Sequence, residues 1–121
     1  MGYRELIKKV QHYSGFSDQE SKRALEQTVE ALAGRLTADE RKDFASQLPS
    51  ELQEVALSAH TVDKKSKADL IGDFMQRQNI RRDRAKKQLL AAWQALKDAI
   101  TKGEIEDIKA QLPKSASALL Y

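Results

Sequence analysis

The sequence predicts an all-α fold, a compact helical bundle of two tandem, pseudo-two-fold-related four-helix repeats. Helix-favouring Ala, Leu, Lys, Glu, Gln and Arg are abundant, whereas Pro occurs only twice. Apolar residues recur at helical spacing, with too few β-branched and aromatic residues for sheets. Residues 36–49 also recur as 100–113, where each copy places Glu three residues after a Thr and ends in Gln-Leu-Pro. This repetition indicates a duplicated helical unit.

The first two helices are predicted from an apolar face and a cap. Residues 3–13 place their apolar side chains on one helical face, and the following Ser14-Gly15 ends the helix. A capping box then opens a second helix, because the Ser17 hydroxyl can accept from the Glu20 amide while the Glu20 carboxylate reaches back. The buried stripe of this helix continues to about Leu36.

The remaining elements of the first half follow from a second capping box and a proline. Thr37 and Glu40 open a third helix that buries Phe44 and Leu48. Pro49 ends it and is favoured in the first turn of a fourth helix, so Gln-Leu-Pro marks a corner between helices. A polar, Lys-rich linker is predicted at about residues 58–66.

The second half repeats this order without a gap. Residues 67–121 align with residues 3–57, and their agreement falls on the apolar stripe, the caps and the corner. We therefore expect residues 1–121 to form one domain in which the two repeats bury their apolar faces against each other.

These motifs also carry a resemblance to a known family. The pattern Ala31-Leu32-x-x-Arg35-Leu36-Thr37-x-x-Glu40 leads to Gln47-Leu48-Pro49, and Ile100-Thr101-Lys102-Gly103-Glu104 leads to Gln111-Leu112-Pro113. Over nearly its whole length the chain resembles the bacterial family called domain of unknown function 2267. The resemblance implies an all-helical fold and no agreed activity. The Lys-rich linker differs from the Gly-Trp pair expected there.

Composition excludes several classes of function. The chain has no Cys, which removes disulfides, Cys-ligated metals and thiol catalysis. No stretch has the length of a signal peptide core or a membrane span, so we expect a cytoplasmic protein. His12 and His60 lie in different predicted segments, and acidic pairs such as Glu104 and Asp107 are expected in solvated first turns. No catalytic, metal or cofactor site is predicted.

The charges are unevenly distributed between the halves. Residues 1–60 carry 8 basic and 10 acidic side chains, whereas residues 61–121 carry 13 and 8. The largest difference between the repeats is a basic cluster at a helix start, where cations oppose the helix dipole. It comprises Arg77, Arg81, Arg82, Arg84, Lys86 and Lys87. Two explanations stay open: a site for an anion or acidic partner, or a solvated face paired with nearby acids.

Apolar residues are also unequally distributed. Met75, Leu90 and Ile105 stand where the first repeat has polar side chains. They pack between the repeats or form a surface for a protein partner or a homodimer. The sequence therefore favours a non-enzymatic protein-interaction or scaffold module, and nucleic-acid or other polyanion binding through residues 77–87 is the alternative.

Overall fold

Helices account for the regular structure of the protein in the computed structural model, which describes residues 1–62 and 69–120. The first four helices are α1 (Tyr3–Ser14), α2 (Asp18–Ala33), α3 (Ala38–Ser46) and α4 (Ser50–Leu57). The other four are α5 (Leu70–Gln78), α6 (Arg82–Lys97), α7 (Lys102–Gln111) and α8 (Lys114–Leu119). No strand occurs in the described residues. The predicted all-α class is confirmed.

Three helices begin with the predicted hydroxyl cap. The side chains of Ser17, Thr37 and Thr101 each accept a hydrogen bond from the backbone amide three residues later. These bonds satisfy one of the amides that a helix start leaves without a partner. Pro49 and Pro113 immediately precede α4 and α8, so both Gln-Leu-Pro corners join two helices as predicted.

The second helix is shorter than its apolar stripe suggested. It ends at Ala33 instead of about Leu36, and a turn of residues 34–36 follows. The Leu36 side chain is nevertheless buried. The turn directs Leu36 toward the core, so the apolar pattern extends beyond the last residue of the helix.

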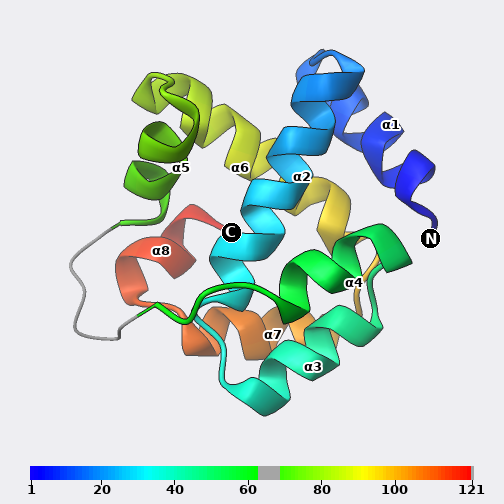
Figure 1. The fold of residues 1–121 in the computed structure, drawn as a ribbon, viewed down its shortest axis with the longest axis vertical. Coiled ribbons are helices and arrows are strands. Elements are labelled where there is room, and N and C mark those ends of the chain that lie inside the picture. Colours follow the sequence, from blue (N-terminus) through cyan, green and yellow to red (C-terminus); the bar gives the residue numbers. More distant parts are fainter. Residues whose placement is uncertain (63–68, 121) are drawn as a thin grey trace.

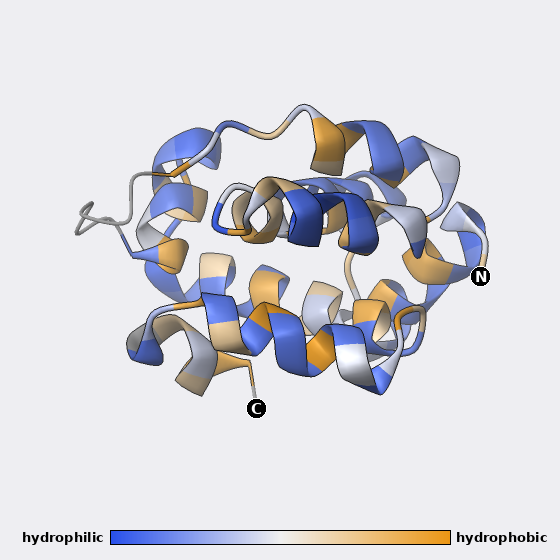
Figure 2. Ribbon diagram, turned by 90° about the horizontal axis from the view of Figure 1, so that it is seen from below, coloured by the Kyte–Doolittle hydropathy of each residue, from blue (hydrophilic) through white to orange (hydrophobic). Residues whose placement is uncertain are grey.

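The core lies between helices from the two halves of the chain. α2 packs against α6, α1 also packs against α6, and α3 packs against α7. Figure 1 shows α2 running through the centre of the molecule, with α3 and α7 near one end. In Figure 2 the helices form two layers with hydrophobic residues concentrated between them. The largest fully buried side chains are Trp93, Phe44 and Phe74.

Helix positions in the two halves follow a common spacing. α6, α7 and α8 begin 64 residues after α2, α3 and α4, respectively. α1 and α5 both end at a residue in the left-handed conformation, Gly15 with φ 78° and Asn79 with φ 53°. The stretch between the halves begins after α4, and its residues 63–66 lie outside the described part of the chain.

The start of that stretch is held against the first half. The Arg41 guanidinium donates to the carbonyl oxygens of Ala33 and Ala59, at 3.0 and 3.1 Å, and to the Thr61 hydroxyl at 3.2 Å. The Val62 amide donates to the Gly34 carbonyl at 2.7 Å. Residues 59–62 therefore have a defined path along the corner between α2 and α3.

Candidate functional site

The start of α6 carries most of the predicted basic cluster. Arg81 occupies the cap position, and its side chain makes no capping bond. Arg81, Arg82, Arg84, Lys86 and Lys87 are all exposed, as is Arg77 near the end of α5. The corresponding position in α2 is Ser17, which does cap its helix. The two helix starts therefore differ in both capping and charge.

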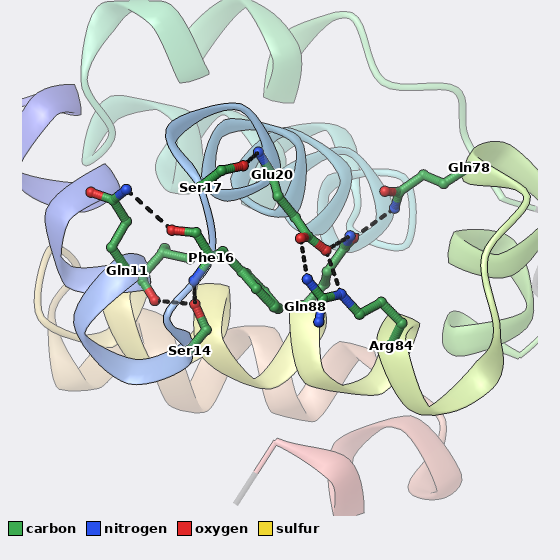
Figure 3. Close-up of polar contacts among 9 residues, drawn as sticks. Gln11, Ser14, Phe16, Ser17, Glu20, Gln78, Arg84 and Gln88 are labelled. Atoms are coloured by element: carbon green, nitrogen blue, oxygen red, sulfur yellow. Dashed lines mark hydrogen bonds and ion pairs between the residues drawn. The ribbon is translucent and has the colours of Figure 1, made fainter.

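Arg84 is tied to the first half by a two-pronged ion pair. Its Nε atom donates to Glu20 Oε2 at 2.7 Å, and its Nη2 atom donates to Glu20 Oε1 (Figure 3). These bonds from Arg84 are the main reason that the pKa of Glu20 is lowered. The Glu20 carboxylate thus contacts α6, and only the Ser17 half of the predicted capping box is present. An arginine across the interface offers the carboxylate stronger bonds than a neutral backbone amide does.

A chain of side-chain amides extends this contact toward α5. Gln88, which is 1% exposed, donates from Nε2 to Glu20 Oε2 at 2.9 Å. Its Oε1 atom accepts from Gln78 Nε2 at 2.7 Å, as Figure 3 shows. Burial strengthens such bonds, because water does not compete for the donors and acceptors. The network joins α2, α5 and α6 beneath the basic cluster.

An aromatic side chain lies directly beneath two of the cations. The Arg84 guanidinium carbon is 4.5 Å from the centre of the buried Phe16 ring, and Lys87 Nζ is 5.4 Å from it. Both distances fit a cation–π interaction. The sequence does not predict this pairing, because Phe16 is far from the basic residues along the chain. The packing of the α1–α2 turn on α6 brings them together.

The cluster divides into paired and unpaired members. Arg77 contacts Glu30 at 2.7 Å, and Arg82 contacts Asp69 at 3.4 Å. Within the described residues, the side chains of Arg81 and Lys86 make no hydrogen bond or ion pair. Three of the four arginines thus act partly as structural ion pairs, as the solvated-face explanation expected. The side chains of Arg81, Lys86 and Lys87 are exposed, and Lys87 also lies over the Phe16 ring.

A shallow groove lies beside the cluster, between α1 and α6. Its volume is about 380 Å³, and it is lined by Tyr13, Lys87, Leu90, Ala91 and Gln94. Tyr13 is 48% exposed, which is high for so large an apolar ring. Its hydroxyl donates to Asp98 Oδ2 at 3.3 Å, and this bond fixes the ring beside α6.

The three predicted apolar surface residues occupy different environments. Met75 and Ile105 are partly buried and pack against the core. Leu90 is partly buried and lines the groove. α5 and α7, which carry Met75 and Ile105, lie toward opposite ends of the molecule in Figure 1. Of the three, Leu90 is the residue placed beside the basic cluster.

A second, more enclosed recess of about 220 Å³ lies between α5 and α8. Its apolar lining consists of Leu70, Pro113, Ala116 and Leu119. Its charged lining consists of Arg35, Asp69 and Arg82. The Arg35 side chain is 7% exposed and contacts Asp73 at 3.1 Å. Each of these charges has an opposite neighbour, since Arg35 pairs with Asp73 and Arg82 pairs with Asp69.

The acidic residues of α7 depart from the expected solvated arrangement. Glu104 is only 5% exposed, and burial raises its pKa. The sequence placed Glu104 and Asp107 together in a solvated first turn. That expectation was wrong for Glu104 because α3 packs over this part of α7. Asp107 is exposed, as expected.

These observations define an all-helical protein with a partly apolar groove beside a basic helix start. Residues 3–119 match the family of uncharacterized conserved proteins DUF2267, and the chain therefore belongs to this family. The predicted resemblance is confirmed. A search of curated proteins found no match to the chain. No helix in the described part of the chain combines the length and apolar character needed to cross a membrane.

Proposed function

We propose that the protein is a non-enzymatic interaction module that binds an acidic amphipathic helix of a partner protein in the groove between α1 and α6. The observation that carries this proposal is the exposed Tyr13 ring beside Leu90 and Lys87 in one groove. A helix lying in a groove buries an apolar stripe while its polar residues face the rim. The groove supplies both an apolar floor and a cationic rim.

Charge complementarity supports an acidic partner over a neutral one. Lys87 lines the groove, and Arg81 and Lys86 are exposed on the same helix without an ion pair in the described residues. Acidic side chains on the partner would meet these cations and speed association. The apolar contacts would supply the part of the affinity that salt does not screen.

We further infer that the two halves are copies related by a pseudo-two-fold axis. α2 packs on α6 and α3 on α7, so helices 64 residues apart in the chain contact one another. Glu20 and Arg84 are also 64 residues apart, and they contact each other directly. A two-fold axis brings equivalent positions into contact where they lie on the axis. The groove would then combine α1 of one copy with α6 of the other.

The test uses a fluorescein-labelled synthetic helix with a Leu stripe and Glu on its polar face. We expect binding by fluorescence anisotropy, weakened at least about tenfold, or about 1.4 kcal/mol, by Lys87→Glu with Leu90→Ala. The control is Lys42→Glu with Leu57→Ala, which makes the same two kinds of substitution at exposed residues of α3 and α4. A peptide of the same composition with a scrambled stripe should bind weakly.

Two results would overturn the proposal. One is absence of peptide binding at about 100 μM protein, a concentration at which even weak associations are detected. The other is equal loss of binding in the control double variant. That outcome would show that the peptide responds to overall charge and hydrophobicity and does not use the groove.

Polyanion binding is the second candidate, supported by the exposed Arg81 and Lys86 side chains. Labelled duplex DNA, single-stranded DNA and RNA would be titrated across a salt series. Binding to phosphates should weaken steeply as salt rises. Loss of this binding in Arg81→Ala with Lys86→Ala would locate it at the start of α6. These two residues are chosen because their replacement leaves the Arg84–Glu20 pair intact.

A further inference from the structure

A second unusual feature lies at the contact between α3 and α7, away from the groove. Two acidic positions recur on these helices, Glu40 and Asp43 on α3 and Glu104 and Asp107 on α7. The two pairs are 64 residues apart, and the helices pack against each other. The fold therefore brings like charges together along this contact.

Glu104 is the member of this group that is removed from water. It is 5% exposed, and its Oε1 atom is buried without a hydrogen-bond partner in the described structure. Glu40, at the equivalent position on α3, is only partly buried. A buried carboxylate oxygen without a donor is costly when it is charged and much less so when it is protonated. The geometry alone thus favours the neutral acid.

The charges around Glu104 also favour its protonated form. Burial is the largest cause of its raised pKa, and the negative charges of Asp107, Glu40 and Asp43 add to it. These come from its own helix and from α3, the element packed against it. The α7 dipole opposes them, because a helix start favours a negative charge, but the net direction remains upward.

We propose that Glu104 is a proton-binding site that controls the α3/α7 contact. Protonation removes a buried charge and its repulsion by three neighbouring carboxylates, so α7 packs firmly on α3. Ionisation at higher pH restores the repulsion and loosens the first turn of α7. A proton is the appropriate ligand, because it converts the carboxylate with its unpartnered Oε1 oxygen into a neutral carboxyl group.

The direction of the pH effect follows from linkage. The folded protein holds the Glu104 proton more tightly than the unfolded chain does. Its contribution to stability is therefore fully present below the ordinary pKa of glutamate and is lost as pH rises through the folded-state pKa. In Glu104→Gln the side chain cannot ionise, so this contribution to stability should not be lost as pH rises.

The experiment compares Glu104→Gln with Glu5→Gln by thermal unfolding between pH 4 and pH 8. Glu5 is a matched control because it occupies the same position in the first turn of α1 but is exposed. We expect Glu104→Gln to raise the melting temperature at pH 8 and to match the native protein at pH 4. Glu5→Gln should give no rise, because it loses a favourable interaction with the α1 dipole.

Two further measurements distinguish a contact controlled by protonation from a buried glutamate that only lowers the stability of the fold. Carbon-13 NMR titration should place the Glu104 midpoint above the ordinary pKa of a glutamate side chain, and Asp43→Asn should lower that midpoint. Hydrogen exchange should show the Glu104 and Ile105 amides, both bonded to Thr101, losing protection as pH rises. This loss should be absent in Glu104→Gln. A Glu104 midpoint at or below the ordinary pKa of glutamate, or identical protection in the native protein and in Glu104→Gln, would overturn the proposal.

Discussion

The recess beside α8 predicts that one substitution will stabilise the protein while its counterpart in the other half destabilises it. Ala116 lines the recess of about 220 Å³. The residue 64 positions earlier is Leu52, which is fully buried in the first half. Ala116→Leu should therefore place a side chain that the first half already accommodates into space that the second half leaves unfilled.

The magnitude follows from the carbon atoms added or removed. Leucine has three more carbon atoms than alanine, and burying them is worth about 0.8 kcal/mol each. Fixing the leucine side chain costs about 0.5–1 kcal/mol. The expected net gain for Ala116→Leu is about 1–2 kcal/mol. Leu52→Ala should instead cost about 2–5 kcal/mol, because it removes the same atoms from a filled site.

Urea unfolding measures both effects. Far-ultraviolet circular dichroism would report helix loss, and the single tryptophan, the fully buried Trp93, would report the core. Trp93 Nε1 donates to the Leu120 carbonyl at 2.7 Å, so its fluorescence also reports docking of the chain end after α8. A destabilisation of more than about 1 kcal/mol by Ala116→Leu would refute the reasoning, because overpacking carries such a cost.

The Glu20–Arg84 ion pair and the surroundings of two glycines each predict how substitutions change stability. Glu20→Arg and Arg84→Glu should each lower the melting temperature, because each places like charges together. The double variant, which exchanges the two residues, should restore most of the loss. Strictly additive losses would show that the pair is not coupled. Gly34→Ala should cost about 1–3 kcal/mol in urea unfolding, since the added Cβ would lie 2.5 Å from the His60 carbonyl oxygen. Gly103→Ala has no neighbour closer than 4.0 Å and should gain up to about 1 kcal/mol, so equal effects at both glycines would contradict the structure.

Much of the fold is predictable from the sequence because its signals are local. Hydroxyl caps at Ser17, Thr37 and Thr101 and prolines at 49 and 113 mark five helix starts by chemistry confined to one turn. The end of α2 was less predictable. Apolar spacing records which residues face the core, and Leu36 faces it from a turn.

The candidate site was predictable only in part, because its components come from distant stretches. The basic residues of α6 stand out in the sequence as an unusual helix start. Their partners Glu20 and Phe16 belong to the first half and could not be assigned from spacing. Tyr13 likewise joins Leu90 in the groove through packing of α1 on α6. An ion pair across an interface leaves no local pattern.

By itself the sequence determined the all-α class, the family, most helix boundaries and the separation of charge between the halves. These properties depend on local propensity, capping and composition, which short stretches express independently. Tertiary packing alone decided which arginines are paired, that Tyr13 and Leu90 share a groove, and that Glu104 is buried. Each depends on what an element far along the chain places opposite a residue. Burial and charge pairing therefore depend on both of the stretches that pack together, and neither stretch determines them alone.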